Sequence, residues 1–68
     1  MSDNVYKMID VVGSSSVSIE DAVQGAINRS ADSVNHVEWF EIKEVRGHVR
    51  DGKVGHYQVV LKIGFRLD

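Results

Sequence analysis

The sequence predicts an α+β fold of order β-α-β-β, in which a three-stranded antiparallel sheet curls around one helix. Residues 37–50 and 53–67 alternate apolar and polar side chains on either side of Asp51-Gly52, a dipeptide typical of a two-residue hairpin turn. A segment with helical periodicity precedes this hairpin, and a shorter alternating segment precedes the helix. All 68 residues are expected to form a single domain, residues 1–68.

The first strand is expected over residues 4–12, NVYKMIDVV, which are rich in β-branched and aromatic side chains. The sequence GSSS follows and indicates a loop that leads into the helix. Backbone N–H groups of this loop could hold a phosphate. However, the loop lacks the lysine and the glycine spacing of a P-loop, so a plain strand-to-helix connection is the favoured interpretation.

A helix is expected over about residues 19 to 33. Ser18 is a good N-cap, and Asp21 three residues later gives a pattern similar to a capping box. Small and β-branched residues recur at helical spacing and form one narrow apolar stripe. Its members are Ile19, Ala22, Val23, Ala26, Ile27, Ala31 and Val34. This stripe favours close packing of the helix on the apolar face of the sheet.

The hairpin strands are too long for this helix to cover. About 15 helical residues extend for about 22 Å, whereas a strand of 15 residues reaches about 50 Å. The sheet must therefore curl around the helix or be covered by further copies of the chain. Small domains often gain stability from disulfides, metals or self-association, and this chain has no cysteine. Both arguments favour a homo-oligomer.

Trp39 is the only tryptophan, and the alternation places it on the face of the sheet that points away from the helix. In HVEWFEIKEV, Phe40 and Ile42 share the apolar face. The other face is expected to carry Val37, Trp39, Glu41 and Lys43.

The two-residue turn also predicts a register, because it pairs Arg50 with Lys53. The same register places Trp39 opposite Gly64. The further pairs that it predicts are Glu41 with Lys62, Val45 with Gln58, Val37 with Arg66, His48 with Gly55, and His56 with Gly47. The alternation falters at KEVRG, so a β-bulge there is an alternative, and it would turn Val45 toward the helix.

Lys62 and Arg66 are expected diagonally beside Trp39, with open space next to the indole at Gly64. This arrangement suits a planar anion, because indole stacks on aromatic rings and a cation meets a phosphate. The alternative is structural. Large aromatic side chains often shield a cross-strand glycine, and Trp39 would then only pack against a neighbouring subunit.

Several functional classes find no support in the sequence. The net charge of −2 gives no reason to expect binding to nucleic acid or to membranes. No apolar run approaches the roughly 18–20 residues of a membrane span. The N-terminal sequence is unlike a signal peptide, so a cytoplasmic protein is expected.

Catalysis and metal binding are likewise not expected. No nucleophile–base pair is recognisable, so we predict no catalytic residue and no enzyme activity. The predicted register puts His48 and His56 on opposite faces of the sheet, with His36 at the far end, so no metal site is predicted.

The chain resembles the dodecins, small flavin-binding proteins of bacteria and archaea. The resemblance covers nearly the whole chain and rests on VGSSSVSIEDAVQGAINRS, WFEIKEVRGHV and GKVGHYQVVLKIGFRLD. It implies a β-α-β-β subunit and a hollow, roughly spherical homododecamer. It also implies flavins bound in pairs at subunit interfaces, with their isoalloxazine rings stacked between tryptophans.

The resemblance implies roles for individual residues. Trp39 matches the stacking tryptophan, and Gln58 matches a glutamine that hydrogen-bonds the polar edge of the flavin. Arg46 and Arg66 match arginines associated with the polar tail of the ligand or with other bound nucleotides. Together with Lys62 and Val45, the predicted cofactor-binding set is Trp39, Gln58, Arg46, Val45, Arg66 and Lys62.

The implied cofactor is FMN, riboflavin or FAD, and coenzyme A is a further candidate ligand. The implied function is flavin storage and buffering, since stacking between two indoles lowers free flavin and quenches its excited state. The alternatives are a structural homo-oligomer without a cofactor and a flavin-dependent enzyme.

Gln58 lies six residues from Gly64, or about 20 Å along a strand. We therefore predict that the Trp39 and Gln58 that contact one flavin come from different subunits, or that a bulge brings them closer.

Overall fold

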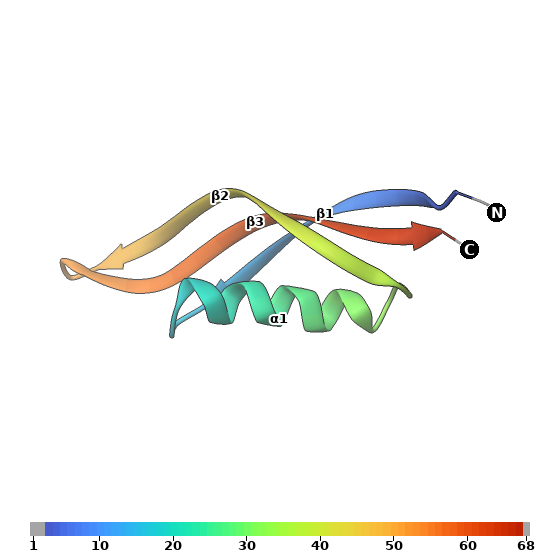
Figure 1. The fold of residues 1–68 in the computed structure, drawn as a ribbon. Coiled ribbons are helices and arrows are strands. Elements are labelled where there is room, and N and C mark those ends of the chain that lie inside the picture. The colour runs from blue at the N-terminus through green and yellow to red at the C-terminus, as the bar shows by residue number, and fades with distance from the viewer. Residues whose placement is uncertain (1–2, 68) are drawn as a thin grey trace.

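The computed structural model describes residues 3–67, so residues 1, 2 and 68 of the predicted domain lie outside the described part of the chain. Four elements follow in the predicted order: β1 (Val5–Ser15), α1 (Ile19–Ala31), β2 (Val37–Arg50) and β3 (Lys53–Leu67). The strands form one antiparallel sheet in the order β1-β3-β2. Helix α1 lies along one face of this sheet (Figure 1). The predicted β-α-β-β fold is therefore confirmed.

Strand β1 continues three residues beyond the predicted end, because Gly13–Ser15 also pair with β3. The buried hydroxyl of Ser15 then organises the start of α1. Its oxygen accepts hydrogen bonds from the N–H groups of Val17 and Ser18, at 2.9 and 3.3 Å. It also donates to the Asp21 carboxylate at 2.7 Å, and the Asp21 N–H donates to the Ser18 hydroxyl at 3.0 Å. These backbone N–H groups are bonded within the chain, so the structure does not support a phosphate site here.

Helix α1 ends two residues before its predicted end. The N–H groups of Asp32 and Ser33 donate to the carbonyls of Arg29 and Ser30, at 3.3 and 3.0 Å, and this three-residue spacing tightens the last turn. The apolar stripe also stops early, because Ala31 is exposed whereas Ser30 is buried. Among residues 3–67, no helix has the length and hydropathy that crossing a bilayer requires.

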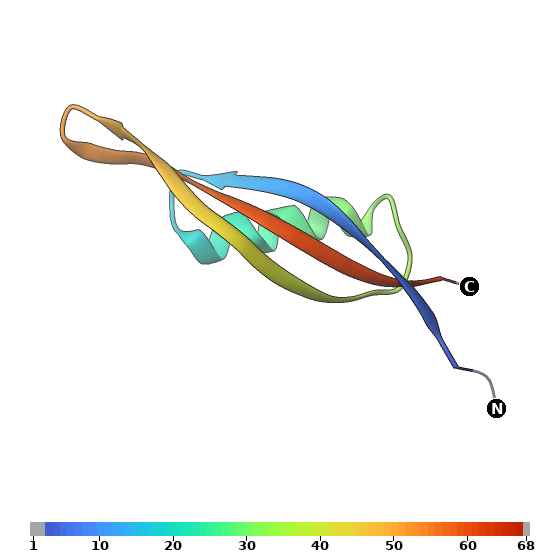
Figure 2. The ribbon, with the colours of Figure 1, turned by 90° about the horizontal axis from the view of Figure 1, so that it is seen from above.

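The core lies where α1 packs on the middle of β3, the central strand of the sheet (Figure 2). Its buried apolar residues are Ala22, Ala26, Val59, Leu61 and Ile63. The small helix residues face larger β3 side chains, as the predicted stripe requires. The close approach of helix and sheet therefore depends on small residues at the contact.

The β2–β3 hairpin extends well beyond the helix, as Figure 1 shows. The molecule measures 57 × 20 × 13 Å, whereas the 13 residues of α1 span about 20 Å. Large apolar side chains stay exposed toward the turn, at Val49 and Val54. Others are exposed on β2 opposite the core residues of β3, at Phe40, Ile42 and Val45. The prediction that the helix cannot cover the hairpin is confirmed. This surface is of the kind that proteins bury against a partner.

Gly25 offers a direct test of the helix surroundings. It is exposed in the middle of α1, and a Cβ added there meets no atom within 4 Å. Gly25→Ala should therefore stabilise the fold by about 0.5–1 kcal/mol, because alanine loses less backbone entropy in a helix. Thermal unfolding at a fixed protein concentration measures the change. A lower Tm for this variant would contradict the open surroundings of Gly25.

Candidate functional site

The register of β2 against β3 matches the prediction beside the turn and at Trp39, and it differs between these positions and at Val37. Trp39 lies opposite Gly64, and Arg50 lies opposite Lys53, as predicted. Lys43 has no partner on β3, which confirms the suspected bulge within KEVRG. Nearer the turn, Gly55 of β3 has no partner on β2. Because each strand gains one extra residue, the two irregularities cancel.

Several predicted pairs are wrong for this reason. Val45 lies opposite Val59 instead of Gln58, so it shares the helix-facing side of the sheet. His48 lies opposite His56, whereas the bulge-free register assigned them Gly55 and Gly47. The segment between the two bulges is shifted by one residue, which turns its side chains to the other face.

Val37 is also misplaced by the bulge-free register. It lies opposite Phe65 instead of Arg66, because Glu38 is an extra residue between Val37 and Trp39. Val37 is half-buried against the core. The predicted grouping of Val37 with Trp39 on one face is therefore wrong, whereas the position of Trp39 itself is confirmed.

Trp39 packs over Gly64 on the face of the sheet that points away from α1, called the outer face below. A Cβ built on Gly64 would lie 2.2, 2.3 and 2.6 Å from three ring atoms of the indole, Cε2, Cζ2 and Cδ2. The indole therefore fills the space that was expected to stay open beside it. Tyr6 meets Trp39 edge-on, with 5.2 Å between ring centroids and 69° between ring planes. Trp39 remains only half-buried.

Each cation predicted near Trp39 faces an acidic side chain. The Lys62 Nζ lies 3.4 Å from Oδ1 of Asp10 on β1. The Arg66 Nη1 lies 3.6 Å from Oε2 of Glu38, and its Nη2 lies 3.1 Å from Nδ1 of His36. The pairing of Lys62 with Asp10 was missed, because nothing local in the sequence fixes the register of β1. The surroundings of the indole are therefore close to electrically balanced.

Arg46 and Gln58 form a second group further along the outer face. They lie opposite each other because of the bulge, and Arg46 Nη1 donates to Gln58 Oε1 at 2.8 Å. Arg46 also pairs with the carboxylate of Glu44. The six residues of β3 from Gln58 to Gly64 correspond to about 20 Å. The structure thus separates the predicted residues into two groups.

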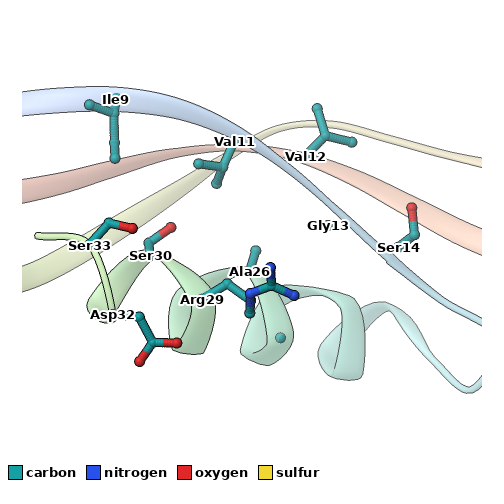
Figure 3. Close-up of a pocket in the computed structure, with 11 residues that line it drawn as sticks. Ile9, Val11, Val12, Gly13, Ser14, Ala26, Arg29, Ser30, Asp32 and Ser33 are labelled. Atoms are coloured by element: carbon teal, nitrogen blue, oxygen red, sulfur yellow. The ribbon is translucent and has the colours of Figure 1, made fainter.

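A second candidate site is a hollow between β1 and α1 (Figure 3). It has a volume of ≈ 970 Å³ and is lined by apolar Ile9 and Val11 of β1 and by Arg29 and Asp32 at the end of α1. None of the six predicted cofactor-binding residues lines it, and its lining contains no aromatic ring. It offers no stacking surface for a planar ligand, so the outer face is the better candidate site.

Comparisons with known proteins point to one family. A family model described as Dodecin matches residues 5–68. A curated dodecin from Thermus thermophilus is 45% identical over 64 residues, which are 94% of this chain and 93% of that protein. A Mycobacterium tuberculosis protein named calcium dodecin is 31% identical over 64 residues, 94% of this chain and 90% of that protein. The solved structure of dodecin from Streptomyces davaonensis superposes with a TM-score of 0.94 at 42% identity and covers 98% of each chain.

Proposed function

Because the chain belongs to the dodecin family, whose members are small, non-catalytic flavin-binding proteins, we propose that it stores and buffers flavin. In this proposal, pairs of FMN or riboflavin stack between Trp39 side chains at subunit interfaces. The observation that carries it is the indole packed over Gly64 on the outer face. A ring held in this way has one face against the sheet and can stack on a flavin with the other.

The separation of the two groups on the outer face supports a site shared between copies. A flavin in contact with Trp39 would need to reach about 20 Å along β3 to meet Gln58 of the same chain. The bulge at Lys43 changes which residue faces Gln58, but it does not shorten β3. We therefore infer that Gln58 of a second copy completes each flavin site.

The contact with Arg46 gives Gln58 a defined role in this proposal. Arg46 donates to the amide oxygen of Gln58 at 2.8 Å. The amide nitrogen of Gln58 is then the group left to donate hydrogen bonds to a ligand. A carbonyl on the polar edge of a flavin ring is a suitable acceptor.

The charges favour ring stacking over phosphate recognition as the main anchor. Lys62 faces Asp10, and Arg66 faces Glu38, so a phosphate would have to compete with a carboxylate at each cation. Ring stacking needs no such exchange. The proposal therefore includes riboflavin, which has no phosphate, alongside FMN.

The exposed apolar side chains of the hairpin support self-association. Val49 is 75% exposed and Val54 is 58% exposed, although both are apolar and lie in the sheet. Burying such side chains is the main driving force of most protein association. We propose that copies of this chain cover these surfaces in a homododecamer and thereby bring Trp39 and Gln58 of different copies together.

Substitution of Trp39 tests the proposed stacking. Titration of the flavin-free protein with FMN should strongly quench flavin fluorescence, and Trp39→Ala should lose most of the binding and the quenching. One ring stack is worth about 1–3 kcal/mol by alanine substitution, so we expect binding to weaken by about 5- to 150-fold. The mass of each protein in solution shows whether the assembly is intact.

Two outcomes would contradict the proposal. Equal quenching of FMN by Trp39→Ala and by the unsubstituted protein would rule out the indole stack. If the unsubstituted protein leaves FMN fluorescence unchanged and Trp39→Ala only disrupts the assembly, Trp39 is a packing residue of a structural oligomer.

A further inference from the structure

The hairpin carries a histidine pair that the proposed flavin site does not use. The rings of His48 and His56 are stacked, with 4.5 Å between centroids and 19° between planes. They lie opposite each other on β2 and β3. The expectation that they could not converge within one subunit is wrong, because the bulges at Lys43 and Gly55 shift the strand segment between them by one residue.

We propose that His48 and His56 together bind one divalent transition-metal ion, with Zn²⁺ as the reference ion, through one ring nitrogen each. Imidazole is the commonest metal-binding side chain in proteins. Two nitrogens bound to tetrahedral zinc at about 2.0–2.1 Å lie about 3.3 Å apart. The rings are stacked with 4.5 Å between centroids, so both must turn out of the stacked arrangement to point one nitrogen each at a shared ion. The broad χ2 torsion of histidine allows this rotation.

The surroundings leave room for the remaining ligands. A hollow of ≈ 330 Å³ adjoins the pair and is lined by His48, Val49, Arg50, Gly55 and His56. His48 is exposed and His56 is half-buried, so water or a side chain of another copy can complete the tetrahedron. The two backbones are fixed by antiparallel pairing, so the site is largely formed before metal arrives.

The charge of Arg50 limits the strength of such a site. Its guanidinium belongs to the lining of the same hollow and repels a dication, while the two imidazoles bring no negative charge. We therefore expect Zn²⁺ to bind more weakly than at a zinc site built from thiolates. We also expect the preference among metal ions to be the one typical of nitrogen ligands. Affinities should follow the order that such ligands show, with Cu²⁺ above Zn²⁺ and Zn²⁺ above Mn²⁺.

Isothermal titration calorimetry with Zn²⁺ tests the proposal on the assembled protein. The protein is first treated with a chelator and dialysed, and the titration is made at one fixed pH, because protons compete with metal ions for their ligands. Saturable binding of no more than one ion per chain is expected. His48→Gln and His56→Gln should each weaken Zn²⁺ binding by about tenfold or more. Removing a side chain that only hydrogen-bonds a metal ligand already weakens metal binding by about 10- to 100-fold.

The third histidine supplies a matched control. His36 lies in the loop before β2 with a φ of 63°, a conformation that asparagine also adopts readily. His36→Asn should therefore keep the Zn²⁺ affinity of the unsubstituted protein. The proposal fails if no saturable Zn²⁺ binding occurs, or if His48→Gln and His56→Gln bind Zn²⁺ as His36→Asn does. Tighter binding of Mn²⁺ than of Zn²⁺ would also overturn it, since that order indicates oxygen ligands. Flavin quenching is measured separately, so this failure leaves the flavin proposal untouched.

Discussion

Gly64→Ala should push Trp39 off the sheet and remove flavin stacking. The added methyl group would lie 2.2–2.6 Å from three ring atoms of the indole. Neither partner can avoid this contact unless the indole moves, because the Cβ is fixed to the central strand of the sheet. A displaced ring no longer presents its open face in the same place. We therefore expect FMN binding to fall about as far as in Trp39→Ala, by about 5- to 150-fold, and quenching to fall with it.

The emission of the single tryptophan reports the displacement without any ligand. Trp39 is the only tryptophan in the chain, so a red shift of the emission in Gly64→Ala measures its greater exposure to water. Gly55→Ala is the matched control, because a Cβ there would lie 3.5 Å from its nearest neighbour, the carbonyl oxygen of His48. Unchanged emission in Gly64→Ala would contradict the packing of Trp39 on Gly64. A red shift with undiminished FMN quenching would instead contradict the stacking proposal.

Gly13→Ala should destabilise the subunit. Gly13 is buried on β1 above the helix, as Figure 3 shows. A Cβ there would lie 2.3 Å from the carbonyl oxygen of Ala22 and 3.0 Å from the Cβ of Ala26. The first of these atoms belongs to the helix backbone, so β1 and α1 must separate. Forcing an extra methyl group into a packed core typically costs about 1–3 kcal/mol.

Chemical denaturation compares Gly13→Ala with Gly25→Ala at one protein concentration. The two substitutions add the same atoms, but only Gly13 touches the partner element. We expect opposite signs, with Gly13→Ala unfolding at lower denaturant and Gly25→Ala at higher denaturant than the unsubstituted protein. Equal midpoints for all three proteins would show that β1 and α1 tolerate a wider spacing.

The parts of the fold that depend on local patterns could be predicted from the sequence. Both strands of the hairpin have the predicted bounds, because alternation and the Asp51-Gly52 turn are encoded within a few residues. Asp51 and Gly52 have φ values of 51° and 76°, the positive angles that a type I′ turn requires. The predicted pairing of Trp39 with Gly64 also holds, but only because the two bulges between the turn and Trp39 cancel.

The bulges mark where this local argument fails. KEVRG signalled the first one, because strict alternation would have turned Glu44 and Arg46 toward the core. A glycine inside a strand, such as Gly55, is a typical sign of a second bulge. However, a single glycine does not show whether the ladder skips a residue there. The pairing of His48 with His56 was missed for this reason.

Contacts that involve β1 were beyond the reach of sequence patterns. No tight turn joins β1 to β3, so their register depends on how the whole sheet packs on α1. The ion pair of Lys62 with Asp10 and the hydrogen bonds of Ser15 at the helix start both follow from that packing. The role of Arg46 in orienting Gln58 depends in turn on the bulge.

The central place of β3 has a consequence during protein synthesis. Strands β1 and β2 each pair only with β3 within residues 3–67, although both are translated before it. At about 5–20 residues per second, the ribosome needs roughly 1–3 s to add the 15 residues of β3. During that time the apolar side chains of both earlier strands have no sheet to join. The sheet, and with it the surface that further copies would cover, can therefore form only after β3 has been made.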